Sequence, residues 1–261
     1  PTDLSTVVSA GRYDGVIVTY QASGLKEIEA QGTPVVSALA SNPGVDNVSL
    51  DEHAIGVMAA QHLIGCGYRS FAYYGYAETW SMARYGGFRD TLHAAGFPLA
   101  TTFTGTVMME TAVPRMSPVT PEVFVGGLIP PVAVMACHDA AGREIADAAI
   151  ERGWSGPGDV AVLGVDNDEL LCETGACPLS SVDPNLYRLG FEAALLLDRK
   201  MRGGKHALPG PVAPREVVRR QSTSVFAHDD PDIASAMRII HEKACGGISV
   251  MTVCEALGMS R

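Results

Sequence analysis

The hydrophobic pattern alternates between two periods along most of the chain. Short apolar runs, most of them with β-branched residues, predict strands at residues 15–19, 35–36, 71–75, 132–136 and 160–163. Between them, apolar residues recur every three or four positions and predict helices at residues 24–31, 55–63, 82–95, 140–152 and 185–201. Strands and helices alternating at this spacing predict an α/β fold with a parallel sheet and right-handed crossovers.

The predicted strand at Val160 to Leu163 ends in an acidic turn, Gly164 to Glu169. Open α/β sheets bind their ligands at the carboxyl ends of their strands, which is where this turn lies. Asp166 and Asn167 accept and donate in fixed directions, which suits an array of hydroxyl groups better than a phosphate. An Asx-turn that merely caps the next helix explains the same residues, so the turn by itself leaves both hypotheses open.

Two parts of the chain interrupt the alternation. Residues 99–127 are low in charge and weakly periodic, and no element is placed there. Pro209 to Pro214 form a stiff, turn-rich connection that precedes an alternating strand at residues 216–220. We therefore expect a boundary shortly after this strand.

The last part of the chain has a helical pattern. Asp230 as N-cap and Pro231 as the first helical residue predict a helix start. Two apolar stripes follow, separated by a turn at Gly246, at Ile233, Ala236, Met237 and Ile240 and at Val250, Val253, Cys254 and Leu257. Gly258 ends the second helix, and Ser260 is typical of the N-cap of a third. Helix, turn and helix predict the opening of a helix-turn-helix module.

Composition narrows the class of protein. Of the 261 residues, 47% are hydrophobic and 18% are charged, which is typical of a globular chain. The net charge of −10 lies entirely before Arg215 and argues against nonspecific binding of nucleic acid by that part. The six cysteines form no C-x-x-C pair, which fits a reducing cytoplasm. No apolar run reaches the ~18 residues of a membrane span, and no basic-then-apolar export signal is present.

Enzymatic function is not favoured by the sequence. It contains no G-x-S-x-G elbow, no P-loop and no H-E-x-x-H motif, and no cofactor is expected. A metal site formed by His138, Asp139 and Asp166 matches no ligand spacing, and no second histidine is near. We therefore expect no metal.

Several motifs occur in an order that resembles the sugar-sensing domain of the lac/gal repressor family. They are the segments DGVIV, D-x-x-A-x-G, AQHLIGCGY, RYGGF, His138-Asp139, GVDND and PLSSV, at residues 14–18, 51–56, 60–68, 84–88, 138–139, 164–168 and 178–182. The resemblance covers Tyr13 to Thr223 and implies a two-lobed, type I periplasmic-binding-protein fold. It implies a sensor domain over residues 1–225, with lobe 1 at about 1–97 and 183–205 and lobe 2 at about 98–182 and 212–225.

The tail resembles the start of an AraC-type DNA-binding domain, which would occupy residues 226–261. A sugar-repressor-like sensor followed by an AraC-type domain is similar to the xylose-operon regulators, as is the junction sequence Arg219 to Thr223. The chain has no initiator Met and stops where the third helix would begin. We therefore expect a fragment that lacks strands of the first lobe, is less stable than a longer chain, and binds sugar but not operator DNA.

The resemblance implies roles for particular residues. Arg84, at the start of a helix facing the cleft between the lobes, would donate a planar fork of N–H groups to two adjacent sugar hydroxyls. Asp166 would accept from hydroxyls across the cleft. Trp80, in the loop before that helix, would stack on the apolar face of a pyranose. The alternatives are a surface arginine paired with Asp90 or Glu78, and a tryptophan of the core.

His138, Asp139 and Asn167 complete the expected ligand-binding residues. Many sugar repressors have Asn-Asp where this chain has His138-Asp139, which leaves open the hydroxyl that the first position recognises. Asp139 also suits the start of the following helix, where a carboxylate interacts with the helix dipole.

The sequence thus predicts a cytoplasmic, sugar-responsive transcription regulator. The expected partners are a monosaccharide effector, with a pentose such as xylose favoured, and operator DNA bound through the C-terminal domain; a homodimer is implied by the resemblance. Sugar would shift an equilibrium between open and closed lobes. The alternative is the solute-binding protein of a sugar ABC transporter, which predicts an export signal and no DNA-binding tail.

Overall fold

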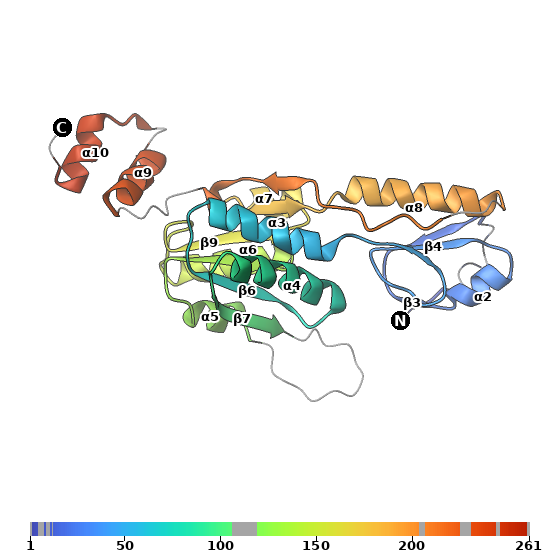
Figure 1. Cartoon of the computed structure of the whole chain (residues 1–261). Helices are drawn as coiled ribbons and strands as arrows, with labels where there is room; N and C mark the ends of the chain where they lie inside the picture. The colour runs from blue at the N-terminus through green and yellow to red at the C-terminus, as the bar shows by residue number, and fades with distance from the viewer. Residues whose placement is uncertain are drawn as a thin grey trace. The chain divides into compact units, whose positions relative to one another are not determined.

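The computed structural model describes residues 2–4, 8, 11, 13–105, 119–203, 207–224, 231–243 and 246–259 (Figure 1). The chain divides into two compact units. Unit 1 consists of Pro1–Asp51 and Pro184–Arg215, and unit 2 consists of Glu52–Asp183 and Glu216–Arg261. Among the described residues, no helix is both long and apolar enough to cross a membrane.

Unit 1 contains a three-stranded parallel sheet with the order β2-β4-β5. Its strands are β2 (Val16–Val18), β4 (Val35–Ala38) and β5 (Asp46–Val48), and its helices are α2 (Leu25–Ala30) and α8 (Leu186–Met201). Unit 1 also contains a short pair of parallel strands, β1 (Thr2–Asp3) and β3 (Ala22–Ser23). The expected strands and helices at residues 15–19, 24–31, 35–36 and 185–201 are confirmed.

Lys200 fastens α8 to the sheet of unit 1. Its Nζ lies 2.5 Å from Glu29 Oε1 and 2.8 Å from Asp46 Oδ2, and it donates to the carbonyl of Val35. In the same unit, Val18 and Val35 are buried in a core that also includes Leu25 and Ile28 of α2. A cation shared between two carboxylates and a backbone oxygen retains polar partners despite its burial, so the contact is compatible with a packed interior.

Unit 2 is built around a six-stranded sheet with the order β11-β10-β9-β8-β6-β7. All neighbours are parallel except β11, which pairs antiparallel with β10. The strands are β6 (Phe71–Tyr76), β7 (Leu99–Gly105), β8 (Val132–Ala136), β9 (Val160–Val165), β10 (Ser180–Asp183) and β11 (Glu216–Val218). Every residue of β8 and β9 is buried, as their unbroken apolar runs predict.

The helices of unit 2 come before, between and after its strands in the sequence. They are α3 (Glu52–Gly65), α4 (Thr79–Ala94), α5 (Pro121–Gly126), α6 (Asp139–Glu151), α7 (Glu169–Glu173) and the 3₁₀ turn η1 (Gln221–Thr223). After residues that lie outside the description come α9 (Pro231–Lys243) and α10 (Val250–Leu257). Ser249 caps α10 by accepting from Thr252 N, and Gly258 ends it with φ 66°.

Several expectations are corrected here. Helix α4 begins at Thr79, three residues before the expected start, so Trp80 lies in its first turn and not in a loop. Residues 99–127, where no element was placed, contain strand β7 and helix α5, the latter capped by Thr120. The expected helix caps at Asp230 and Ser260 lie outside the described residues.

The unit boundary also differs from the expected lobes. Residues 52–97 lie in unit 2, although they were expected in lobe 1. The reason is strand pairing: β6 lies beside β8, with Phe71 opposite Ala133, so this segment belongs to the larger sheet. Similarly Val212, expected in lobe 2, forms a bridge with Leu50 of unit 1.

Helices α3 and α4 approach each other closely at two glycines. A Cβ atom at Gly56 would lie 2.0 Å from Arg84 O, and one at Gly87 would lie 2.0 Å from His53 O. Neither distance leaves room for a methyl group, so the two backbones can touch here because both positions are glycine. Because the Arg84 carbonyl takes part in this contact, the contact helps to position the Arg84 backbone relative to α3.

We expect Gly87→Ala to destabilise the protein by about 2 kcal/mol, because the added methyl group forces α3 and α4 apart. Gly86→Ala is the matched control. A Cβ at Gly86 meets nothing within 4 Å, so this helical position should gain roughly 0.5–1 kcal/mol from the lower entropy of the unfolded chain. Urea denaturation of both variants measures the difference; equal stability of the two would contradict close packing of these helices.

Candidate functional site

The candidate site lies at the point where the strand order of unit 2 reverses. From β6 the chain adds β7 on one side of the sheet and then returns to add β8 on the other side. The loops after β6 and β8 therefore diverge at the carboxyl ends of these strands, which is the usual place for a ligand in an open α/β sheet. Helices α4 and α6 begin here, and the turn after β9 lies one strand further along.

Arg84 on α4 is the central charge of the site. Only 4% of the residue is exposed. Its Nε donates to Glu52 Oε2 at 2.6 Å, and its Nη1 donates to the carbonyl of Cys137 at 2.5 Å. Asp166 Oδ1 is 3.9 Å from Nη1. The guanidinium thus links the N-terminus of α3, the end of β8 and the turn after β9.

The surface alternative for Arg84 is therefore wrong. Asp90 pairs with the neighbouring Arg89 instead, at 2.7 Å on the exposed side of α4. The partner of Arg84 is Glu52, which sequence reasoning missed because the two residues are 32 positions apart. An acidic residue in the first turn of a helix has an ordinary explanation in the helix dipole, so nothing in the sequence singled it out.

Aromatic rings line one side of the arginine. Arg84 Cζ lies 4.9 Å from the centre of the Trp80 ring, a cation–π distance. The rings of Trp80 and His138 are stacked, with centroids 6.2 Å apart, and Tyr76 lies 5.3 Å from His138. Tyr76 is a further site residue that sequence reasoning missed. Together the rings form an apolar surface next to the charged group.

His138 is both a helix cap and a donor. Its Nδ1 accepts from Ala141 N at 3.0 Å, which makes it the N-cap of α6. Burial, followed by the charge of Arg84, lowers the pKa of His138 below its ordinary value. The ring is therefore neutral at pH 7 and carries its proton on Nε2, which is an N–H donor.

Asp139 is buried, with 1% of the residue exposed, and its carboxylate is already engaged. Oδ1 accepts from Ser181 Oγ at 2.6 Å, and Oδ2 accepts from Asp168 N at 2.8 Å. A side chain at Gly164 would collide with it at 2.1 Å. Asp139 thus holds the turn after β9 in place, and its expected contact with a ligand stays a prediction.

The turn Asp166–Asn167–Asp168 combines the two hypotheses drawn from its sequence. Asp168 Oδ1 accepts from Leu170 N and Leu171 N and caps α7, as an Asx-turn predicts. Asp166 and Asn167, however, have φ values of 110° and 51°. Positive φ at residues other than glycine costs about 1–3 kcal/mol each and is concentrated at functional sites. Asp168 thus supplies the cap, while the half-buried Asp166 and Asn167 supply the other polar groups of the turn.

Asp166 has an altered acidity. Loss of solvent contact is the main cause that raises the pKa of Asp166 to about 7, with Asp139, Glu52 and Asp168 acting in the same direction and Arg84 opposing them. Its side chain nevertheless keeps 39% of its surface accessible. This carboxyl group can therefore still reach a ligand, and its charge changes near neutral pH.

The chain matches the periplasmic binding protein-like domain over residues 60–223. It belongs to this family. The α/β fold with parallel sheets predicted from the sequence is confirmed by this match and by the structure.

Relatives within the family include named regulators. The xylose operon regulatory protein of Escherichia coli strain K12 is 29% identical over 264 residues, covering 95% of this chain and 66% of that protein. The HTH-type transcriptional regulator DegA of Bacillus subtilis strain 168 is 28% identical, covering 85% and 68%. The solved structure of the xylose-binding transcription activator xylR is 26% identical with a TM-score of 0.70, covering 95% and 68%. This chain thus spans 66% of the length of the Escherichia coli regulator.

Within this periplasmic-binding-protein-like chain, Arg84 and Asp166 lie in the same unit. They were expected on opposite sides of a cleft, because lobe 1 was expected to extend to residue 97. Both instead project from one edge of the sheet of unit 2, where parallel strands bring successive loops together. Trp80, His138 and Asn167 belong to the same edge.

Glu78 adds a polar group to this edge. Its Oε2 is buried and has no hydrogen-bond partner within the part of the chain that the structure describes. The residue precedes the first turn of α4, two positions before Trp80. A buried carboxylate oxygen without a donor is costly unless a ligand or water supplies one.

Two other sites are less suitable. Across the described residues, no group of three or more His, Cys, Asp and Glu side chains is arranged to hold a metal ion.

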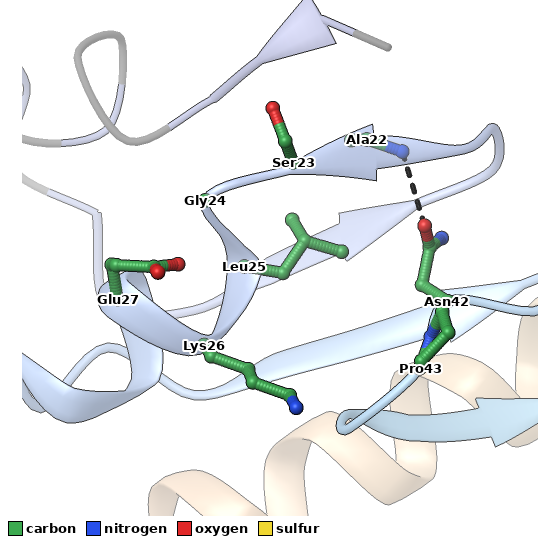
Figure 2. Close-up of a pocket in the computed structure, with 8 residues that line it drawn as sticks. All are labelled: Ala22, Ser23, Gly24, Leu25, Lys26, Glu27, Asn42 and Pro43. Carbon is green, nitrogen blue, oxygen red and sulfur yellow. Dashed lines mark hydrogen bonds between the residues drawn. The ribbon is translucent and has the colours of Figure 1, made fainter.

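A pocket of about 150 Å³ in unit 1 lies at the start of α2, between residues 22–27 and Asn42-Pro43 (Figure 2). Asn42 is fully engaged there, since it accepts from Ala22 N and donates to Tyr20 O and Ser37 Oγ. The amide of Asn42 therefore supports the surrounding loop and is not available to a ligand.

Proposed function

We propose that this protein is a sugar-responsive transcription regulator whose effector is a monosaccharide, with xylose or a related pentose favoured. The observation that carries the proposal is the buried Arg84, held by Glu52 and the end of β8 beside Asp166 and stacked on Trp80. A fixed cationic fork, a reachable carboxylate and an aromatic face together match a polyol with one apolar side.

The individual roles follow from the contacts. Arg84 and His138 Nε2 donate to sugar oxygens, while Asp166 and Asn167 accept from hydroxyl groups. Trp80 covers the apolar face of the ring. Asp139, which is buried under the turn, positions Asp166 and Asn167 through Asp168 N. The protein has no catalytic role in this proposal, because these groups bind and orient a ligand without a nucleophile beside a general base.

The regulator is favoured over the transporter subunit by two observations. The relatives that cover most of this chain are named as transcription regulators. In addition, two helices, α9 and the capped α10, follow the sensor fold in the sequence, which suits the start of a helix-turn-helix domain. Operator DNA as partner, a homodimer and a cytoplasmic location complete the proposal.

Isothermal titration with a panel of sugars tests the effector. We expect one pentose to bind with 1:1 stoichiometry and its 5-phosphate to fail, because the site offers carboxylates where a phosphate requires donors. Absence of binding for every pentose and hexose would contradict the proposal. Gel-shift assays of the complete gene product on its own promoter, with and without that pentose, separate a regulator from a transport protein.

A further inference from the structure

The segment Arg220–Thr223 lies near the end of the sensor fold, and we call it the exit segment because it precedes α9 in the sequence. Side-chain hydroxyl groups bond this segment to the sheet of unit 2. Ser222 Oγ donates to Val162 O at 2.5 Å and accepts from Ser180 N at 2.8 Å. Thr223 Oγ1 donates to Ser180 Oγ at 2.7 Å. The exit segment is therefore held by β9 and β10, the strands that border the turn of the candidate site.

Arg220 reaches from the exit segment to that turn. Its Nη2 donates to Asn167 Oδ1 at 3.0 Å, and its Nη1 donates to Leu179 O at 3.1 Å. Its Nε donates to Glu173 Oε1 at 2.5 Å. A single guanidinium thus connects a proposed ligand-binding side chain to the backbone that leads towards α9.

Strand β10 makes a second connection between the same two places. Successive residues of a strand point to opposite faces. Ser180 Oγ accepts from Arg220 N and bonds to Arg220 O on the side of the exit segment. Ser181 Oγ accepts from Asn167 N and donates to Asp139 on the side of the site. A shift of the turn that moves Ser181 therefore also moves Ser180 and its bonds to the exit segment.

The turn itself is the element able to change. Asp166 and Asn167 have positive φ, and such a backbone persists when its surroundings over-determine it. Here the surroundings are the bonds from Asp166 N to Val182 O and from Asn167 N to Ser181 Oγ, and the bond from Arg220 to Asn167 Oδ1. Removing one of these hydrogen bonds, or adding one from a ligand, shifts the equilibrium between this turn conformation and one without positive φ at Asp166 and Asn167.

We propose that Arg220 is a positioning residue that couples sugar binding at the Asp166–Asn167 turn to the exit segment leading to α9. A sugar that bonds to Asp166 holds the turn in the described conformation, in which Asn167 accepts from Arg220, and so stabilises the exit segment. By thermodynamic reciprocity, an event that loosens the exit segment weakens sugar binding by the same factor. The inference rests on the proposed function and adds a route from its site to the C-terminal helices.

Hydrogen exchange at the Ser222 amide, which donates to Pro178 O at 2.9 Å, measures the stability of the exit segment. With the 261-residue chain, saturating D-xylose should slow this exchange about fivefold. Arg220→Gln should still bind D-xylose but show no slowing. Arg219→Gln is the matched control, since Arg219 is the exposed neighbour with the same charge, and it should behave as the parent does.

Slowing that survives in Arg220→Gln, or unchanged Ser222 exchange in the sugar-bound parent, overturns the coupling. A second measurement needs no sugar. Asn167→Ala and Arg220→Gln should each speed Ser222 exchange, and the double variant should exchange no faster than the faster single variant. Additive effects in this cycle refute the coupling even where D-xylose binds, whereas failure of D-xylose and all other sugars to bind contradicts the proposed function.

Discussion

Replacing Arg84 with alanine is expected to weaken sugar binding at least thirtyfold, about 2 kcal/mol, and to destabilise the fold by roughly 3–5 kcal/mol. The change removes a cation whose Nε is 2.6 Å from Glu52 Oε2, and the side chain of Glu52 keeps only 17% of its surface accessible. A carboxylate is then left without its partner in a desolvated place. The carbonyl of Cys137 and the face of Trp80 lose their contacts as well.

Titration with the identified sugar and urea denaturation measure the two effects. Arg89→Ala is the matched control on the same helix. Arg89 pairs with Asp90, but both side chains are more than half exposed, so this variant should change stability by less than about 1 kcal/mol. An Arg84→Ala variant with the affinity of the parent would show that the site is assigned to the wrong residues.

Asp166→Asn is expected to change sugar affinity and stability in opposite directions. The amide cannot replace a charged acceptor, and affinity at pH 8 should fall by about 2 kcal/mol, roughly thirtyfold. Stability at pH 8 should rise. The pKa of Asp166 is raised to about 7 in the fold, so the stability that the protonated group contributes is present below the unfolded pKa of about 4 and is lost as the pH rises through 7.

Since 39% of the Asp166 side chain is exposed, solvent screening reduces the stability gain of the variant to about 1 kcal/mol. The gain should vanish at pH 4. Sugar affinity of the parent should fall about tenfold from pH 8 to pH 6, because the ionised fraction of a group with pKa 7 falls by that factor. Calorimetric titrations at both pH values measure this.

Asp90→Asn is the matched control, since it removes an exposed carboxylate of the same unit. It should leave both profiles unchanged. A pH-independent affinity in the parent, or a less stable Asp166→Asn at pH 8, would mean that Asp166 is not the strained acceptor that we infer.

The sequence by itself determined the elements and the edge of the sheet where the site lies. Unbroken apolar runs such as Val160 to Leu163 are typical of strands buried on both faces, and the residues that follow them emerge at the carboxyl ends of parallel strands. Asp166, Asn167 and His138 were predicted as site residues for this reason. Local patterns also predicted the two tail helices, because stripe, turn and cap residues lie within a few positions of each other.

Contacts between distant parts of the chain were decided by the tertiary structure alone. Glu52 meets Arg84 across 32 positions, and Asn167 meets Arg220 across 53. Periodicity carries no information at such separations. The start of α4 at Thr79 was missed because Trp80 and Ser81 resemble a polar loop until they pack against the site. Burial of Asp139 likewise depends on Ser181 and Asp168 N, which β10 and the turn after β9 bring to it, so its support of the turn could not be predicted from the sequence.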